Sequence, residues 1–404
     1  AATMNEASIL GQVALGYAPM IDRQRDVTAT RLTVFPARAD AKVPPAPLLE
    51  ALAEAWPADA GALALNVASE TLLHDLMLAQ PAANVMVEVP AFMAVDPAHT
   101  EAIVALHRHG NTLMLQGRPR AELPREVLPC FSAAIVDVAE ERRTDATPPP
   151  GVTRSIGFVQ SGIRSAAEVE AAFQRGAQAV LGWPLDDPLP AADPKAGARS
   201  DLQTVVELIR RVDKEEPVDR LDAVIKLDPT LGFKLLRYIN SPAFGLRVEI
   251  ASFRHAIMML GYQRLKRWLA LLLAQASKEA NMKPVMFAAL RRGLLMEELV
   301  RASGNGQSDP QLRDEAFICG VFSLLDKMMR QPFAELLKSI PVPAAVSQAL
   351  VDSEGPYQPY LELVQAVESA SMFDLREIAE RLMMSVGEVN AALLRALANA
   401  RTLG

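Results

Sequence analysis

Side chains that could hold a metal ion are sparse in this sequence. His74-Asp75 is the only His-Asp dipeptide, and it lies in a stretch of helical pattern. A metal-dependent hydrolase needs several histidine and aspartate ligands that converge on one point. His107 and His109 stand two positions apart, so on a helix they point in different directions and cannot share an ion. We therefore expect these three histidines to be surface residues, His255 to pack against or cap a helix, and no metal to be bound.

The two cysteines and the overall composition narrow the functional classes. Cys130 and Cys319 follow neither metal-type nor redox-type spacing, so we expect two small core residues in a reducing cytoplasm. The formal net charge of -7 and the aromatic content of 5% do not favour nucleic-acid binding, which needs positive charge and stacking surfaces. The sequence contains neither an apolar run of membrane-spanning length nor a secretory signal. These features predict a cytoplasmic protein that binds no membrane and, by preference, no nucleic acid.

The first half of the chain alternates short β-type runs with helical stretches. The expected strands are 13–17, 31–35, 62–67, 85–89, 112–115, 134–138, 155–159 and 179–182. The expected helices between them include 47–55, 71–79, 100–109 and 166–175. Repeated β–α units with nearly continuous apolar strands imply a parallel sheet, and eight strands suggest a closed α/β barrel.

The chain changes character near residue 190. Residues 186–200 are rich in proline, alanine and charge, which is typical of an exposed linker. Beyond residue 200 the pattern is almost wholly helical: one helix begins at Asp228-Pro229, and Gly261 ends the next. The second half is therefore predicted to be an all-α bundle.

Four segments of the second half carry the most specific motif. They are residues 227–231, 234–241, 250–261 and 317–326, and their marker positions are Asp228, Pro229, Asn240, Ser241 and Gly261. Together they resemble the characteristic motif of HDOD domains, because the helix caps, the asparagine, the glycine and the apolar spacing all match that motif at once. The resemblance implies an HDOD domain over residues 200–400, preceded by a linker at 187–199.

Two segments of the first half resemble the opening and the close of EAL domains, which are found fused to HDOD domains. Residues 17–23 read Tyr-Ala-Pro-Met-Ile-Asp-Arg and resemble the opening Gln-Pro-Ile-x-Asp-Arg; residues 162–183 resemble the closing segment. The EAL fold is a modified (β/α) barrel, which the resemblance assigns to residues 8–186. The resemblance to EAL domains implies a first half similar to cyclic di-GMP phosphodiesterases. The combined EAL–HDOD layout implies a bacterial, cytoplasmic signalling protein.

The positions at which EAL chemistry would take place are mostly altered. Hydrolysis of cyclic di-GMP needs metal ions, held by several carboxylates, to activate water and hold the phosphate. The resemblance places Asn66, Glu88 and Asp137 at retained positions. Arg31 replaces the metal-binding glutamate, Gln116 and Gly117 the paired aspartates, Ile135 the lysine, and Ser161 and Arg164 the late glutamates. We therefore expect no phosphodiesterase activity, no metal and no cofactor.

Two alternatives stay open. A cyclic di-GMP receptor would bind without hydrolysis; Arg31 and Arg164 could pair with phosphates, but Ala18 and Leu181 replace family glutamines, so this binding is less favoured. A DNA-binding regulator would use residues 374–400, whose apolar spacing resembles a helix-turn-helix. The charges of that segment cancel, whereas a recognition helix needs surplus positive charge, so we expect it to close the HDOD bundle.

The most basic cluster of the chain contains Arg264, Lys266, Arg267 and Trp268. An exposed Arg/Trp combination is typical of a surface that binds a protein partner. The alternative is a purely structural role: at the start of a helix, the aliphatic parts of the Arg and Lys side chains cover the core while their charged ends stay in solvent. The sequence as a whole predicts a catalytically silent scaffold, linked to cyclic di-GMP pathways, that binds other signalling proteins through its EAL-like and HDOD domains.

Overall fold

The computed structural model describes residues 9–143, 156–189, 200–226, 234–235, 237–241, 253–275, 277, 279–304, 309–340 and 342–403. The chain forms two compact units, which are described separately. The first contains Ala1–Asp187 together with Gln365–Leu394, and the second contains Pro188–Val364 together with Arg395–Gly404.

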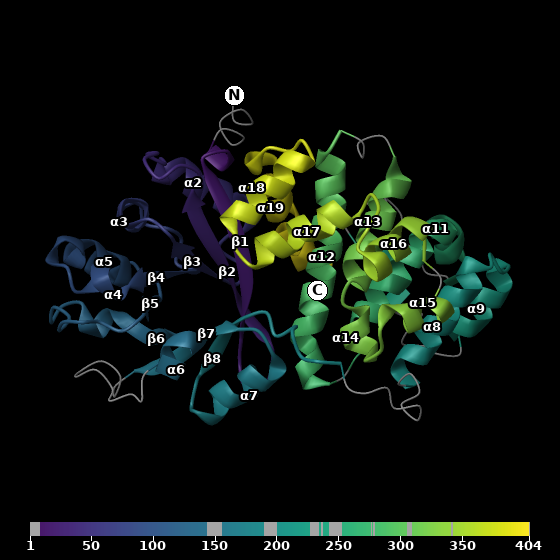
Figure 1. The fold of residues 1–404 in the computed structure, drawn as a ribbon, viewed down its shortest axis with the longest axis horizontal. Helices are drawn as coiled ribbons and strands as arrows, with labels where there is room; N and C mark the ends of the chain where they lie inside the picture. The colour runs from purple at the N-terminus through teal and green to yellow at the C-terminus, as the bar shows by residue number, and fades with distance from the viewer. Residues whose placement is uncertain are drawn as a thin grey trace. The chain divides into compact units, whose positions relative to one another are not determined.

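Eight strands of the first unit close into a barrel in the order of the sequence (Figure 1). They are β1 (Val13–Ile21), β2 (Val27–Pro36), β3 (Ala62–Val67), β4 (Val85–Pro90), β5 (Leu113–Gln116), β6 (Phe131–Asp137), β7 (Gly157–Ile163) and β8 (Ala179–Gly182). The predicted barrel is confirmed, and each expected strand overlaps an observed one. One buried cluster, which includes Ala29, Ala64, Met114, Ile135 and Val159, joins residues of seven strands. It combines alanines with larger apolar side chains, which together fill the limited space inside an eight-stranded barrel.

The first strand departs from the predicted parallel arrangement. β1 pairs antiparallel with β2 and with β8, whereas the pairs from β2 to β8 are parallel. The cause is local, because a tight turn and no helix joins β1 to β2, and such a turn reverses the chain. Asp22 Oδ1 accepts hydrogen bonds from the backbone N–H groups of Gln24 and Asp26, each at 2.9 Å.

Helices follow most of the barrel strands. They are α2 (Pro45–Ala55), α3 (Glu70–Leu78), α4 (Ala91–Ala94), η1 (Pro97–His99), α5 (Thr100–Arg108), η2 (Leu128–Cys130), α6 (Val138–Arg143) and α7 (Ala166–Gln174). Ser69 and Ser165 are the N-cap residues of α3 and α7. Their hydroxyl oxygens accept hydrogen bonds from the N–H groups of Leu72 and Glu168 at 3.2 and 3.1 Å. The caps fix where each helix leaves the strand before it.

Residues 365–394 belong to the barrel unit, although the sequence had assigned them to the helical domain. They include α18 (Met372–Arg381) and the first part of α19 (Val386–Leu403). The fully buried Asn390 donates from Nδ2 to the carbonyl oxygens of Leu10 and Val13 at 2.7 Å each. One helical domain was expected over residues 200–400, closed by this segment; the amide of Asn390 instead has its partners at β1.

The second unit is helical, as predicted. Its elements are α8 (Ser200–Asp213), α9 (Val218–Lys226), α11 (Phe253–Gln275), η4 (Ala280–Met282), α12 (Lys283–Ala302), α13 (Pro310–Phe322), α14 (Leu325–Met329), α15 (Phe333–Ser339), α16 (Ala344–Asp352) and most of α17 (Gln358–Glu368). Gly261 interrupts α11 with a left-handed φ of 72°, so its predicted role as a helix end is confirmed. A Cβ at Gly320 would lie 2.4 Å from the carbonyl oxygen of Arg292, so the crossing of α13 and α12 requires glycine there.

The HDOD marker residues are only partly described. Asp228 and Pro229 lie outside the described residues. The N–H of Ser241 donates to the carbonyl oxygen of Tyr238 at 3.1 Å, and the described helix ends there, as expected from Asn240-Ser241. Among the helices that the structure describes, we find none with the length and apolarity needed to cross a membrane.

Candidate functional site

Six of the positions singled out from the sequence lie on the inner face of the barrel. Side chains of a strand alternate between its two faces, and Ala29, Ala64 and Ile135 belong to the buried interior cluster. The alternation places the following residues on the same face, nearer the carboxyl ends of their strands: Arg31, Asn66, Glu88, Gln116, Asp137 and Ser161. This edge of a (β/α) barrel is where active sites are built.

The centre of this site is an ion pair between β2 and β4. Arg31 Nη2 lies 2.6 Å from Glu88 Oε1, and Arg31 Nε lies 2.8 Å from Glu88 Oε2. The side chain of Glu88 is fully buried and that of Arg31 is 15% exposed. Burial raises the pKa of Glu88, while the charge and hydrogen bonds of Arg31 act in the opposite direction. The guanidinium thus contacts both oxygens of the retained carboxylate.

The other retained positions also have hydrogen-bond partners. Asn66 Nδ2 donates to Thr33 Oγ1 at 3.3 Å, and Gln116 Nε2 donates to Asn66 Oδ1 at 3.4 Å. Asp137 Oδ1 accepts the N–H of Ala139 at 2.8 Å, at the start of α6. Oxygens of the Asn66 amide and the Asp137 carboxylate therefore already accept hydrogen bonds from protein donors.

The remaining altered positions contribute no ligand to this centre. Ile135 belongs to the apolar interior cluster, and Gly117 takes a left-handed φ of 85° directly after β5. Ser161 Oγ donates to Asp137 Oδ2 at 3.4 Å. The side chain of Arg164 is exposed, so the structure does not bring it to the buried pair of Arg31 and Glu88.

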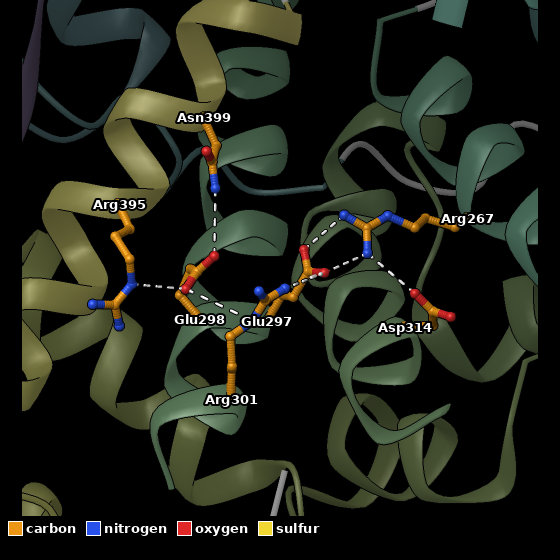
Figure 2. A network of polar contacts seen from close by, with 7 residues as sticks. All are labelled: Arg267, Glu297, Glu298, Arg301, Asp314, Arg395 and Asn399. Atoms are coloured by element: carbon orange, nitrogen blue, oxygen red, sulfur yellow. Dashed lines mark hydrogen bonds and ion pairs between the residues drawn. The ribbon is translucent and has the colours of Figure 1, made fainter. Parts of the chain in front are cut away.

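The helical unit contains a second buried arginine, shown in Figure 2. Arg267 of α11 contacts the two carboxylate oxygens of Glu297 at 2.5 and 2.7 Å and Asp314 Oδ1 at 3.1 Å. The network continues on α12, where Glu298 accepts from Arg395 Nε at 3.0 Å and from Asn399 Nδ2 at 3.4 Å. Four helices, α11, α12, α13 and α19, thus meet through charged groups.

The surroundings of Arg267 explain why its charge is kept. Burial lowers the pKa of Arg267, but attraction to Glu297, Tyr238 and Asp314 outweighs it, so the pKa is raised. Burial also raises the pKa of the Tyr238 hydroxyl, against a hydrogen bond from Arg267. The guanidinium carbon lies 4.4 Å from the centre of the Phe317 ring. Tyr238 and Phe317 belong to two of the segments that resemble HDOD domains, and Arg267 links them.

The predicted partner surface around Trp268 is wrong. Trp268 is 1% exposed and Arg267 is held inside the network, so neither can meet a partner. Arg264 is exposed, and Lys266 is 38% exposed with Nζ 3.5 Å from Asp213. The cause is the helical period, because Trp268 follows Leu265 by three positions and both face the core.

Three ionisable groups that are distant in the sequence come together in the barrel unit. Glu70, Asp96 and His99 each offer one possible ligand atom within 4.8 Å of the others. His74, expected at the surface, is half-buried, and its Nδ1 lies 2.7 Å from Nδ1 of His99. The spacing of Glu70 and His74, one helical turn apart, was visible in the sequence. Their approach to His99 depends on the fold.

Comparison with known proteins matches residues 200–337 to the HDOD domain family. YuxH of Bacillus subtilis (strain 168) is 27% identical over 237 residues, which are 57% of this chain and 55% of that protein. The cyclic di-GMP phosphodiesterase CdgJ of Vibrio cholerae serotype O1 is 28% identical over 193 residues, 47% of this chain and 44% of that protein. The chain therefore spans about half the length of these curated relatives.

Comparison with solved structures returns, among others, the EAL domain of Mycobacterium smegmatis DcpA. That match is 17% identical with a TM-score of 0.32 and covers 44% of this chain and 92% of that chain. A standalone EAL protein from Vibrio cholerae O395, in its c-di-GMP bound form, is 16% identical with a TM-score of 0.31 and covers 45% of this chain and 96% of that chain. The chain thus contains a closed eight-stranded barrel followed by a region that matches the HDOD domain family.

Proposed function

We propose that this chain is a catalytically inactive EAL–HDOD protein that acts in the cytoplasm by binding other signalling proteins. The ion pair between Arg31 and Glu88 carries the proposal. The link to cyclic di-GMP control is supported by the HDOD match and by the relative named as a cyclic di-GMP phosphodiesterase.

The charge of Arg31 opposes the metal ions that phosphodiester hydrolysis would use. A guanidinium remains protonated in proteins, so a divalent cation at Glu88 would be repelled across a few ångströms of low-dielectric interior. The two oxygens of Glu88 already bond Arg31, and a metal would have to replace both contacts. The residues present therefore do not fit such an ion.

The retained neighbours offer too little to compensate for this repulsion. Hard cations take about six oxygen ligands, of which carboxylates supply the negative charge. Asn66 contributes a neutral amide oxygen that already accepts from Gln116, and Asp137 caps the start of α6. Without a metal at this edge, none of the side chains at the altered positions would activate water for attack on the phosphate.

A turnover measurement tests the proposal directly. The full chain is incubated with cyclic di-GMP and Mg²⁺ or Mn²⁺, and the linear product is followed by chromatography beside an active EAL phosphodiesterase. We expect no product above the protein-free control, for both the wild type and Glu88→Gln. Turnover by the wild type that is lost in Glu88→Gln would overturn the proposal.

Binding measured on the same samples separates the receptor alternative from the scaffold. Calorimetry that shows saturable binding of cyclic di-GMP without turnover would favour a receptor, and Arg164→Ala would then show whether the exposed arginine contributes. Absence of binding would favour the scaffold. The partner surface would next be sought with Arg264→Glu, because Arg264 is exposed whereas Trp268 is not.

The DNA-binding alternative is less favoured by the structure. Asn390, within the segment of helix-turn-helix spacing, is 0% exposed and bonds the backbone of the barrel unit. A recognition helix must present polar side chains to base edges. We expect no salt-dependent retention of the full chain on duplex DNA.

A further inference from the structure

The cluster of Glu70, Asp96 and His99 lies on the segments that follow β3 and β4. Glu70 is the first residue of α3, Asp96 caps η1, and His99 is the last residue of η1. β3 and β4 are parallel neighbours, so the chain leaves both at the same edge of the barrel. This explains how residues about 29 positions apart, Glu70 and His99, come into contact.

The ring of His99 is held at both of its nitrogens. Its Nε2 lies 2.8 Å from Glu70 Oε1, and its Nδ1 lies 2.7 Å from Nδ1 of His74. The side chain is 8% exposed, whereas that of Glu70 is 49% exposed. The cluster thus has one buried face, formed by His99, and one face that opens to solvent.

We propose that Glu70, Asp96 and His99 bind a divalent transition-metal cation of the Zn²⁺ class, with His74 as the outer partner of His99. Imidazole nitrogen together with carboxylate oxygen is a donor set that suits such ions. Two ligand atoms on one zinc ion, each at about 2.1 Å, lie about 3.3 Å apart. The 2.8 Å between Glu70 Oε1 and His99 Nε2 needs to widen only slightly.

The second histidine gives the site the outer contact that ligating histidines usually have. A metal at Nε2 of His99 leaves the ring proton on Nδ1, which then donates to Nδ1 of His74. His74 in turn carries its own proton on Nε2, so both rings stay neutral. A simple ion pair between Glu70 and His99 would need neither His74 nor the approach of Asp96.

The third ligand is also held in place. Asp96 Oδ1 accepts the N–H of Ala98 at 2.9 Å, which fixes the carboxylate at the start of η1. Water from the open face of the cluster would complete a tetrahedral set, as in sites with three protein ligands. The cluster lies on segments beyond the ends of β3 and β4 and shares no residue with the pair of Arg31 and Glu88, so this proposal does not depend on whether that centre is catalytically inactive.

Calorimetric titration with Zn²⁺ tests the site on the full chain, freed of any polyhistidine tag and of metal by a chelator. We expect one Zn²⁺ per chain and no comparable binding of Mg²⁺, which disfavours imidazole. His74→Gln should weaken Zn²⁺ binding by about tenfold, as loss of an outer partner does. Glu70→Gln and Asp96→Asn, which retain the hydrogen-bond geometry, should weaken it further.

His107→Gln serves as the matched control, because it removes an exposed histidine from α5 of the same barrel. Its Zn²⁺ affinity should equal that of the wild type. Co²⁺ should give visible absorption bands in the wild type and in His107→Gln that are lost in Asp96→Asn. Circular dichroism confirms that each variant is folded. A folded wild type that does not bind Zn²⁺, or binding unchanged in Glu70→Gln and Asp96→Asn, would overturn the proposal.

Discussion

The barrel and the helical unit each bury an arginine against carboxylates, but the two arginines serve different ends. Arg31 meets the single carboxylate of Glu88 at the edge where barrel enzymes carry their ligands. Arg267 meets Glu297 and Asp314 together and connects three helices. A buried carboxylate requires a nearby cation in both cases. In the barrel that cation contacts one carboxylate on a nearby strand, whereas in the helical unit it joins three helices.

This comparison shows that a buried arginine can either neutralise a single carboxylate or join several elements through more than one. Arg31 provides the charge that Glu88 would otherwise lack inside the barrel. The difference in the number of carboxylates gives the two arginines different expected contributions to stability. Four substitutions test that difference.

Arg267→Met should have the largest effect on stability. It leaves Glu297 and Asp314 without their main cation, and breaking a buried pair costs about 3–5 kcal/mol, here at the upper end because two carboxylates are affected. Chemical denaturation measures the free energy of unfolding. Lys266→Met is the control, since its half-exposed contact with Asp213 should contribute less than about 1 kcal/mol. Equal losses in both variants would contradict a special role for Arg267.

Trp268→Ala should follow closely, because it removes one of the largest fully buried side chains next to Arg267. Truncation of a buried aromatic residue costs about 3–5 kcal/mol. The loss should appear in thermal and chemical unfolding of the isolated protein. A fully stable Trp268→Ala variant that fails only in partner binding would restore the surface interpretation.

Arg31→Met should destabilise the barrel by about 3 kcal/mol at neutral pH, because Glu88 would be left as an unpaired buried carboxylate. The loss depends on pH with a definite sign. Burial raises the pKa of Glu88 above its unfolded value, and without Arg31 nothing from that guanidinium opposes the rise. The folded variant then holds a proton that the unfolded chain releases, so stability falls as pH increases from about 4.3, the unfolded value, towards the raised one.

The double variant Arg31→Met/Glu88→Gln is the matched control for that prediction. It removes both charges, so most of the stability and all of the added pH dependence should return. If the double variant is as unstable as Arg31→Met, the loss comes from packing and not from the unpaired charge. Denaturation curves at several pH values distinguish the two results.

Gln116→Leu should have the smallest effect, about 1 kcal/mol or less, because it removes one long hydrogen bond of 3.4 Å between neutral amides. The free energy of unfolding should change less in this variant than in either arginine variant. A loss comparable to that of Arg31→Met would show that the amides, and not the ion pair, hold this edge of the barrel together.

Local sequence signals predicted most of the elements and part of the site. Apolar alternation in strands and a glycine at a helix end, as at Gly261, act over a few residues and were readable directly. The resemblance to EAL domains, and not strand alternation, had marked Arg31 and Glu88 as positions of one site. The antiparallel β1 was missed because an eight-strand count says nothing of direction, although the short turn at Asp22 was the available signal.

The partner surface at Trp268 failed because a basic cluster along the sequence divides between the two faces of a helix. Arg264 lies on the exposed face, and Trp268 on the buried one. Helical periodicity around Leu265 was sufficient to separate them. The position of residues 365–394, by contrast, had no local signal, because helical patterns look alike whichever unit they pack against.

The sequence by itself determined the two kinds of architecture and the resemblance of the second half to HDOD domains. Tertiary structure alone decided that Arg31 bonds Glu88, that Asn390 bonds the backbone near β1, and that His99 lies between Glu70 and His74. The physical reason is range. Caps and periodicity depend on neighbours within a turn or two, whereas these contacts join residues that meet only after the barrel has closed and the helices have packed on it.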